Sequence, residues 1–204
     1  MERQVDAVVW DIGRVLVHWS IRALYDTLIP DPAQRDWFLA HVITEAWHLQ
    51  HDTGVPLDAM IEERVAAFPQ YRALIEAYRS RWLETLPGPI AENLALIRRL
   101  AARGVPQFAI TNFGVDTWAM FRPTFPILDL LDDIVVSGVE RLVKPDPAIF
   151  ALAARRFGHA PDRMIFIDDN VANIAAAQAL GWQVFHFTGD ALALEVELTR
   201  LGAL

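Results

Sequence analysis

Short apolar runs in this chain lead directly into polar residues of the kinds that carry out chemistry. These residues, with the runs that precede them, are Asp11 after 5–10, Thr111 and Asn112 after 107–110, and Asp168 and Asp169 after 164–167. Almost continuously apolar runs are typical of strands buried on both faces of a parallel sheet. The carboxyl ends of parallel strands meet at one edge of the sheet, where ligands bind. We therefore expect these side chains to converge there, together with Lys144 from a loop.

The second half of the chain alternates between helix and strand patterns, with proline and glycine at the boundaries. The expected helices end at 103 and cover 115–121, 147–157 and 172–180, and the expected strands end at 110 and cover 133–137, 164–167 and 183–187. This alternation predicts an α/β fold with a doubly wound parallel sheet that is covered by helices on both faces.

The region between the first strand and this alternation shows helical patterns only. Apolar residues recur at helical spacing in four segments, 21–29, 37–47, 57–68 and 71–83. Asp31 and Asp58 stand where helices would start, and acidic residues are favoured at that position. We therefore predict a Rossmann-like core of residues 1–16 and 88–204, with a four-helix insertion over residues 17–87.

The composition favours a globular protein with a sizeable apolar core, since 53% of the 204 residues are hydrophobic and none is cysteine. The formal net charge is −8 and the positive charges are scattered, which disfavours a nucleic-acid partner. No apolar run reaches the roughly 18 residues of a membrane span, and the first residues lack the apolar centre of a signal peptide. We expect a cytoplasmic protein that binds neither nucleic acid nor membranes.

The order of these motifs resembles that of the haloacid dehalogenase superfamily of hydrolases, whose members carry an Asp-led loop, a Thr or Ser, a Lys and an acidic pair. The segments from Lys144 to Phe150 and from Ile167 to Ile174 strengthen the resemblance. The insertion after the first strand resembles the helical cap of many members. The resemblance implies a Rossmann-like hydrolase that acts on a small phosphorylated molecule.

The same resemblance implies a role for each motif. Asp11 is implied to be a nucleophile that forms an aspartyl-phosphate, which water then hydrolyses. Thr111 and Asn112 are implied to bind the phosphoryl group, and Lys144 is implied to neutralise it. The residues implied to hold Mg²⁺ are Asp11, Gly13 through its backbone carbonyl, Asp168 and Asp169; oxygen ligands beside a phosphate suit this ion.

Gly13 departs from the usual pattern of such phosphatases, which carry a second aspartate at this position as general acid and base. The missing proton donor is normally worth about 10²- to 10⁴-fold in rate. His18 is a nearby candidate for this role, or else a packed or surface histidine. The pattern Asp-x-Gly-x-Val over residues 11–15, with residues 48–54, is similar to sugar-1-phosphate (glucose-1-phosphate) phosphatases. Because an anomeric oxygen leaves more easily than an ordinary alkoxide, a sugar phosphate is a consistent substrate.

Two other functions fit parts of the sequence. A metal-independent 2-haloacid dehalogenase also lacks the second aspartate, but it has no use for the adjacent Asp168 and Asp169, whose charges would repel its substrate. The other alternative is a non-catalytic protein that keeps the fold, and Gly13 is the only residue that supports it. The sequence leaves open the physiological substrate, the residue that replaces the acid, the oligomeric state and the cap residues that set specificity. Candidates in the cap are Arg22, Arg35, Glu45 and the pair His48 and His51, which could ligate a metal or form a polar face.

Overall fold

The computed structural model describes residues 4–204 and contains one parallel sheet of five strands in the order β5-β4-β1-β6-β7. The strands are β1 (Ala7–Trp10), β4 (Gln107–Thr111), β5 (Asp133–Val136), β6 (Met164–Asp168) and β7 (Gln183–His186). β1 is central, and Val9 lies opposite Phe108 of β4 and Phe166 of β6. The chain builds β1, β4 and β5 toward one edge and then returns to build β6 and β7 toward the other. The predicted doubly wound α/β fold is confirmed.

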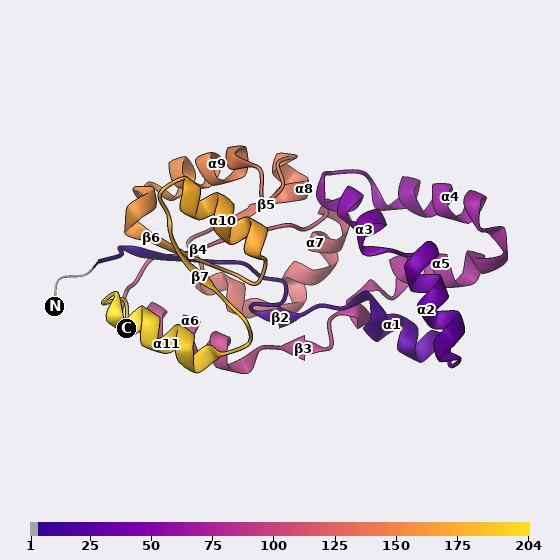
Figure 1. Ribbon diagram of the computed structural model, residues 1–204, viewed down its shortest axis with the longest axis horizontal. Coiled ribbons are helices and arrows are strands. Elements are labelled where there is room, and N and C mark those ends of the chain that lie inside the picture. Colours follow the sequence, from indigo (N-terminus) through magenta and orange to yellow (C-terminus); the bar gives the residue numbers. More distant parts are fainter. Residues whose placement is uncertain (1–3) are drawn as a thin grey trace.

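Helices cover both faces of this sheet (Figure 1). They are α6 (Ala91–Ala102), α7 (Val115–Phe121), α8 (Ser137–Glu140), α9 (Pro147–Phe157), α10 (Val171–Ala179) and α11 (Ala191–Arg200). Alternate side chains of β1 enter different apolar clusters, with Ala7 and Val9 on the side of α9 and α10, and Val8 and Trp10 on the side of α6 and α11. This alternation explains why the strand sequences are apolar throughout.

The insertion between β1 and α6 contains five α-helices among the described residues, where the sequence pattern predicted four. They are α1 (Ile21–Leu28), α2 (Pro32–His41), α3 (Glu45–Asp52), α4 (Leu57–Ala67) and α5 (Arg72–Ser80). The segment 37–47 was expected as one helix, but it divides between α2 and α3. The hydroxyl of Thr44 accepts a hydrogen bond from the Trp47 amide (3.0 Å) and so caps a new helix.

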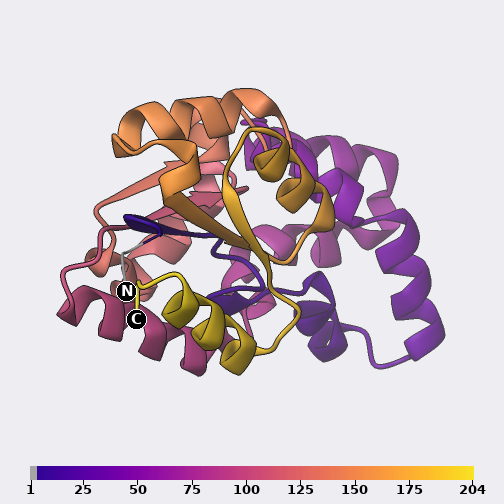
Figure 2. The ribbon, with the colours of Figure 1, turned by 60° about the vertical axis from the view of Figure 1, so that its left-hand side comes forward.

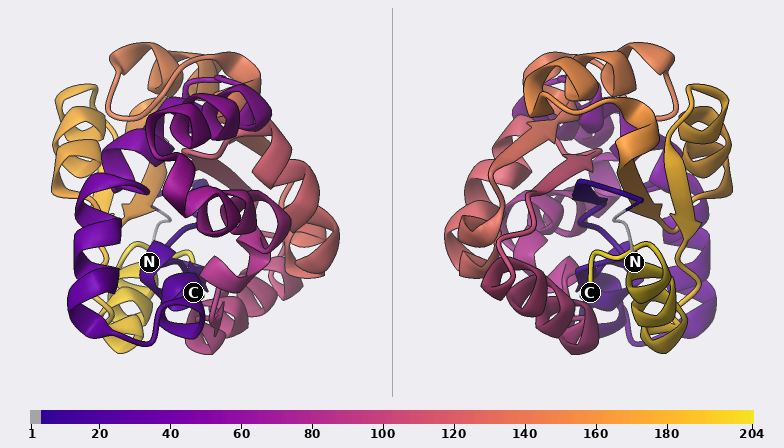
Figure 3. Two further views of the ribbon diagram at one scale, coloured as in Figure 1. Left: turned by 90° about the vertical axis from the view of Figure 1, so that its right-hand side faces the viewer. Right: turned by 90° about the vertical axis from the view of Figure 1, so that its left-hand side faces the viewer.

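The insertion, which we call the cap, stands at the end of the sheet where the strands terminate, as Figures 2 and 3 show from further directions. Its two connections to the core, β2 (Val17–His18) and β3 (Gly88–Pro89), pair as a short antiparallel ribbon. Short 3-10 helices complete the structure: Pro69–Tyr71, Trp82–Thr85, Arg122–Thr124, Pro126–Leu130 and Pro161–Arg163. Within residues 4–204, no helix has the length and apolar character needed to cross a bilayer.

The cap packs closely on α7 and α8 of the core. The Ser137 hydroxyl donates to the backbone carbonyl of Asp52 (2.8 Å), and the Leu57 amide donates to the Asp116 carboxylate (2.9 Å). Gly114 precedes α7, and a Cβ atom at Gly114 would lie 1.9 Å from the His51 ring of α3. Since this contact requires the absence of a side chain at Gly114, the sequence is adapted to a closed cap.

Candidate active site

Asp11 immediately follows β1, between the neighbouring strands β4 and β6. The direction of strand addition reverses between β1 and β6, and in open α/β sheets ligands bind at such a point. The Asp11 Oδ1 atom accepts a hydrogen bond from the Ile12 amide (2.7 Å) and lies 2.9 Å from Lys144 Nζ. Among the described residues no hydrogen bond reaches Oδ2, so that oxygen is available to attack a substrate.

Lys144 is buried between two carboxylates from different strands. Its Nζ atom lies 2.9 Å from Asp11 Oδ1 and 2.7 Å from Asp168 Oδ2. Burial alone would lower the pKa of Lys144, but Asp11 and Asp168 outweigh this effect and raise it. Lys144 is therefore a fixed cation at neutral pH.

Asn112 positions Lys144 through the backbone. Its side-chain amide donates to the Lys144 carbonyl (3.0 Å), and its side-chain oxygen accepts from the Lys144 amide (2.9 Å). The side chain predicted to bind phosphate is thus engaged in holding the lysine loop. Thr111 is buried at the carboxyl end of β4, beside Asn112.

Asp11, Asp168 and Asp169 each offer a carboxylate oxygen, and these atoms lie within 4.8 Å of one another. Burial raises the pKa of Asp11. Lys144 opposes this rise, whereas Asp168 and Asp169 add to it. Burial also raises the pKa of Asp169, and Asp168 adds to the rise. Three clustered carboxylates exceed the single charge of Lys144, and a divalent cation with oxygen ligands would balance the remainder. The residues present therefore fit Mg²⁺.

The two adjacent aspartates occupy different positions. Asp168 is fully buried, and its oxygens accept hydrogen bonds from Lys144 (2.7 Å), the Asn170 amide (2.8 Å) and the Asn173 side chain (3.1 Å). Asp169 is half-buried and lines the same pocket as Asp11. The Asn173 side-chain amide, from α10, lies 3.1 Å from both oxygens of Asp168 and so helps to hold this carboxylate in place.

A pocket of about 140 Å³ lies between this carboxylate cluster and the cap. The core supplies polar groups that include Asp11, Gly13, Asn112, Lys144 and Asp169. Much of the opposite wall is apolar. The cap supplies Trp19, Leu49, Trp82 and Leu86 to this wall, and the core supplies Phe113. The pocket is smaller than the roughly 300–1,000 Å³ typical of sites for drug-sized ligands, which favours a small substrate in the closed arrangement.

Arg14 lines this pocket in a left-handed backbone conformation, with φ of 59°. Its guanidinium lies 2.9 Å from Glu45 of the cap and 4.9 Å from the centre of the Trp19 ring. A non-glycine residue held in this region costs free energy, and such residues cluster at functional sites. Arg14 was not predicted as a site residue, whereas Glu45 was a candidate in the cap, and the two form an ion pair.

His48, Asp52 and Tyr78 form a buried polar group in the cap. The Tyr78 hydroxyl lies 2.6 Å from His48 Nδ1, and His48 Nε2 lies 3.7 Å from Asp52 Oδ1. His48 and Asp52 both line the pocket. Asp52 was not predicted as a site residue, although it lies within the stretch 48–54 discussed above. Its spacing of four residues from His48, which places both on one helix face, was the available signal.

Several other candidates lie outside the pocket. His51 Nδ1 contacts the Val55 carbonyl (2.8 Å), and His51 Nε2 accepts from the Thr117 amide (3.4 Å), so both ring nitrogens are engaged and a metal-binding pair with His48 is not formed. His18, the candidate acid, lies on β2 and lines a different hollow with Phe187 and Asp190.

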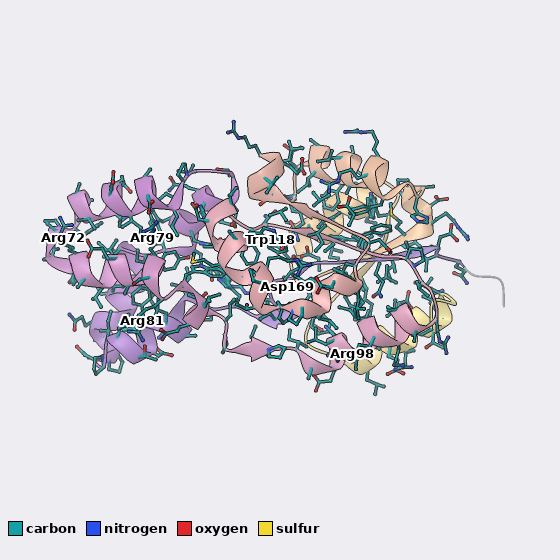
Figure 4. The ribbon with its side chains drawn as sticks, turned by 180° about the vertical axis from the view of Figure 1, so that it is seen from behind. Arg72, Arg79, Arg81, Arg98, Trp118 and Asp169 are labelled. Atoms are coloured by element: carbon teal, nitrogen blue, oxygen red, sulfur yellow. The ribbon has the colours of Figure 1, made fainter. Side chains whose placement is uncertain are left out.

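The cap arginines proposed as substrate contacts form ion pairs inside the cap. Arg22 pairs with Asp36 (2.6 Å) and Arg35 with Asp26 (2.7 Å). Other cap arginines, Arg72, Arg79 and Arg81, lie well away from Asp169 (Figure 4). Asp146, two residues after Lys144, caps α9, because its carboxylate accepts a hydrogen bond from the Ala148 amide (2.8 Å).

Comparison with known proteins gives consistent matches. The model of the haloacid dehalogenase-like hydrolase family matches residues 5–181. Sesquiterpene phosphatase astK of Aspergillus oryzae is 33% identical over 207 residues, which cover 96% of this chain and 95% of that protein.

Solved structures share the fold at lower sequence identity. A HAD-like family hydrolase from Porphyromonas gingivalis superimposes with a TM-score of 0.75 at 19% identity, covering 97% of this chain and 98% of that one. A HAD family enzyme from Bacteroides thetaiotaomicron, in complex with magnesium and inorganic phosphate, gives 0.69 at 18% identity, covering 89% and 93%.

Proposed function

The chain belongs to the haloacid dehalogenase-like hydrolases, and from this premise we propose that it hydrolyses a small phosphate monoester with Mg²⁺ through an aspartyl-phosphate on Asp11. One observation carries the proposal. Asp11 and Asp169 line a pocket between the core and the cap, and Asp168 holds Lys144 beside Asp11. A carboxylate nucleophile next to a cation and an acidic cluster suits attack on a phosphoryl group.

Each residue of the site has its own role in the proposed reaction. Asp11 attacks phosphorus through Oδ2, while the Ile12 amide and Lys144 hold Oδ1. Lys144 offsets negative charge on the transferring group, and Asn112 keeps the lysine loop in place. Thr111 at the end of β4 would contribute its hydroxyl to a phosphoryl oxygen. A bound Mg²⁺ would neutralise the charge that the phosphate and the carboxylates share.

We assign the metal ligands from the contacts of each carboxylate. Asp11, Gly13 and Asp169 line the pocket, and we propose that the two carboxylates and the Gly13 carbonyl would bind Mg²⁺ directly. Asp168 would contribute chiefly by holding Lys144, because its oxygens already accept hydrogen bonds from Lys144 and Asn173.

The lining of the pocket favours a substrate with a compact apolar alcohol. Trp19, Trp82 and Phe113 offer aromatic surface where the alcohol would lie, and bound apolar groups gain roughly 25 cal/mol for each Å² removed from water. The similarity to a sesquiterpene phosphatase supports phosphates of isoprenoid-type alcohols. A sugar phosphate is the second candidate, favoured by Gly13 and by the hydrogen-bonding groups of Asp52 and Arg14 on the pocket wall.

A substrate panel with Mg²⁺ tests this function. It contains butyl phosphate, dimethylallyl phosphate, glucose 1-phosphate and 2-chloropropionate. We expect phosphate release from the first two, loss of activity in excess chelator, and no turnover by Asp11→Asn, because an amide is a poor nucleophile toward phosphorus. Asp58→Asn is the control, since Asp58 is an exposed cap carboxylate paired with Arg79. Metal-independent halide release would instead establish the dehalogenase alternative, and inactivity on every ester would favour the non-catalytic one.

A further inference from the structure

The proton donor that Gly13 cannot provide has a candidate in the cap. We propose that Asp52 protonates the departing oxygen of the substrate and then takes a proton from the water that hydrolyses the aspartyl-phosphate. This assignment rests on the phosphatase function proposed above, and it adds a catalytic residue that comes from the cap.

The position of Asp52 suits the leaving group. Asp52 ends α3 and lines the pocket from the cap side, while Asp11 and Lys144 line it from the core. In phosphoryl transfer the attacking and leaving oxygens lie roughly in line on opposite sides of phosphorus. Attack by Asp11 from the core therefore directs the departing oxygen toward the cap.

Burying the carboxyl group of Asp52 costs free energy of folding, which suggests that the residue is kept for a function. Its exposed fraction is 3%, and within residues 4–204 its Oδ1 atom has no hydrogen-bond partner. The closest basic atom, His48 Nε2, is 3.7 Å away, beyond normal hydrogen-bond length. An ionised carboxylate in this position is only partly compensated, by Lys144 and the Gly114 backbone amide, whereas a neutral carboxyl group is tolerated.

The surroundings favour the protonated form of Asp52. Burial raises the pKa of Asp52 to about 7, against the opposing effects of Lys144 and of the Gly114 backbone amide. Burial lowers the pKa of His48 to about 3, and burial raises the pKa of Tyr78, so both neighbours are neutral near pH 7. The other charged groups that line the pocket are Asp11, Arg14 and Asp169.

Asp52 loses one proton in the first step of the reaction and regains one in the second. In the first, Asp11 forms a bond to phosphorus, the ester P–O bond breaks, and the Asp52 proton passes to the departing oxygen to give the free alcohol. In the second, water attacks the aspartyl-phosphate and gives its proton to the Asp52 carboxylate. The bond between phosphorus and Asp11 breaks, which releases inorganic phosphate and restores both aspartates.

Leaving groups of different basicity test the first step. We compare kcat/KM of the unchanged protein, Asp52→Asn and the control Asp58→Asn on butyl phosphate and on p-nitrophenyl phosphate, whose phenolate departs without a proton. Asp52→Asn should lose about 10²- to 10⁴-fold on the butyl ester and less than about 10-fold on the aryl ester. Equal losses on both esters would show that Asp52 is structural and would overturn the proposal.

The second step has its own signature. Without a base for water, Asp52→Asn should release a burst of one nitrophenolate per active site and accumulate phosphorylated Asp11. Gly13→Asp should then restore butyl phosphate hydrolysis in the Asp52→Asn background by at least about 10-fold, because a Cβ atom at Gly13 meets no atom within 4 Å. Failure of both results would contradict the assignment.

The unchanged protein provides a test that needs no substitution. Its kcat/KM on butyl phosphate should fall about tenfold per unit above pH 7, while the value on p-nitrophenyl phosphate stays level. Superimposed profiles would overturn the role of Asp52 even if its variants do not fold. No hydrolysis of either ester by the unchanged protein with Mg²⁺ would overturn the phosphatase function and this proposal with it.

Discussion

Asp168 and Asp169 are adjacent in sequence, yet their contacts predict different defects. Asp169→Asn removes a carboxylate that lines the pocket, so we expect the Mg²⁺ concentration for half-maximal activity to rise at least about tenfold. Asp168→Asn weakens the contact with Lys144, so we expect kcat to fall by about 10²-fold or more with a smaller change in Mg²⁺ requirement. Magnesium titrations of phosphatase activity measure both quantities. The opposite pattern would make Asp168 the principal metal ligand.

The buried carboxyl of Asp52 also predicts how stability depends on pH. Its pKa is about 7 in the folded protein, against the ordinary value of 3.8 for the unfolded chain, so between these values the folded state binds more protons. The free energy of unfolding therefore decreases as pH rises from about 4 to 7, by up to about 4 kcal/mol for this group. Asp52→Asn should be more stable than the unchanged protein at pH 8, and the gain should shrink toward pH 4.

Denaturant unfolding at pH 8, 6 and 4 measures this difference. Asp58→Asn is the matched control, since its carboxylate is exposed and paired with Arg79, and it should show no such gain at pH 8. A stabilising Asp52→Asn substitution that also slows alkyl ester hydrolysis is the expected behaviour of a residue kept for catalysis. If Asp52→Asn is equally destabilising at every pH, the charge of Asp52 is not a cost to the fold.

At the scale of elements, the core was predictable because each strand is an apolar run that ends at a polar residue. The three runs before Asp11, Thr111 and Asp168 are strands β1, β4 and β6, which lie side by side in the sheet. The cap was less predictable, because the capping hydroxyl of Thr44 divides a continuous helical pattern into α2 and α3. Local capping prevailed there over periodicity.

The site residues were likewise easier to predict in the core than in the cap. Residues at strand ends could be placed from the sequence because sheet topology alone brings Asp11 and Asp168 together. The contact between Tyr78 and His48 could not be predicted, because it depends on how α3 and α5 pack, which periodicity does not specify. For Asp52, the sequence offers only its spacing of four residues from His48. The side chain of Asn112 was expected on the phosphate, whereas its hydrogen bond to the Lys144 loop is a tertiary contact that the sequence does not reveal.

At the scale of the whole molecule, the pocket exists only while the cap rests on the core. Its walls come from both parts, and the Asp52 backbone is held by Ser137 of α8. The cap is joined to the core by the β2–β3 ribbon, around which we expect it to open so that substrate enters and product leaves. The contact between His51 and Gly114 is where closure can be tested most directly.

Gly114→Ala should disrupt this closed arrangement, because the new methyl group would lie 1.9 Å from the His51 ring. The ring cannot move freely, since it is 1% exposed and held by the Val55 carbonyl and the Thr117 amide. We expect Gly114→Ala to reduce the free energy of unfolding by about 1–3 kcal/mol, as overpacking does, and to reduce kcat.

A double-mutant cycle identifies the cause. In a His51→Ala background the methyl group has room, so the cost of Gly114→Ala should fall below about 0.5 kcal/mol, which gives a coupling of about 1–2 kcal/mol. The matched background is His41→Ala, because His41 is an exposed cap histidine on α2 and should leave the full cost of Gly114→Ala unchanged. Additive costs in the His51→Ala background would mean that His51 does not rest on Gly114 in solution. Since α3 carries Asp52, that result would also remove the cap wall on which the protonation of the leaving group depends.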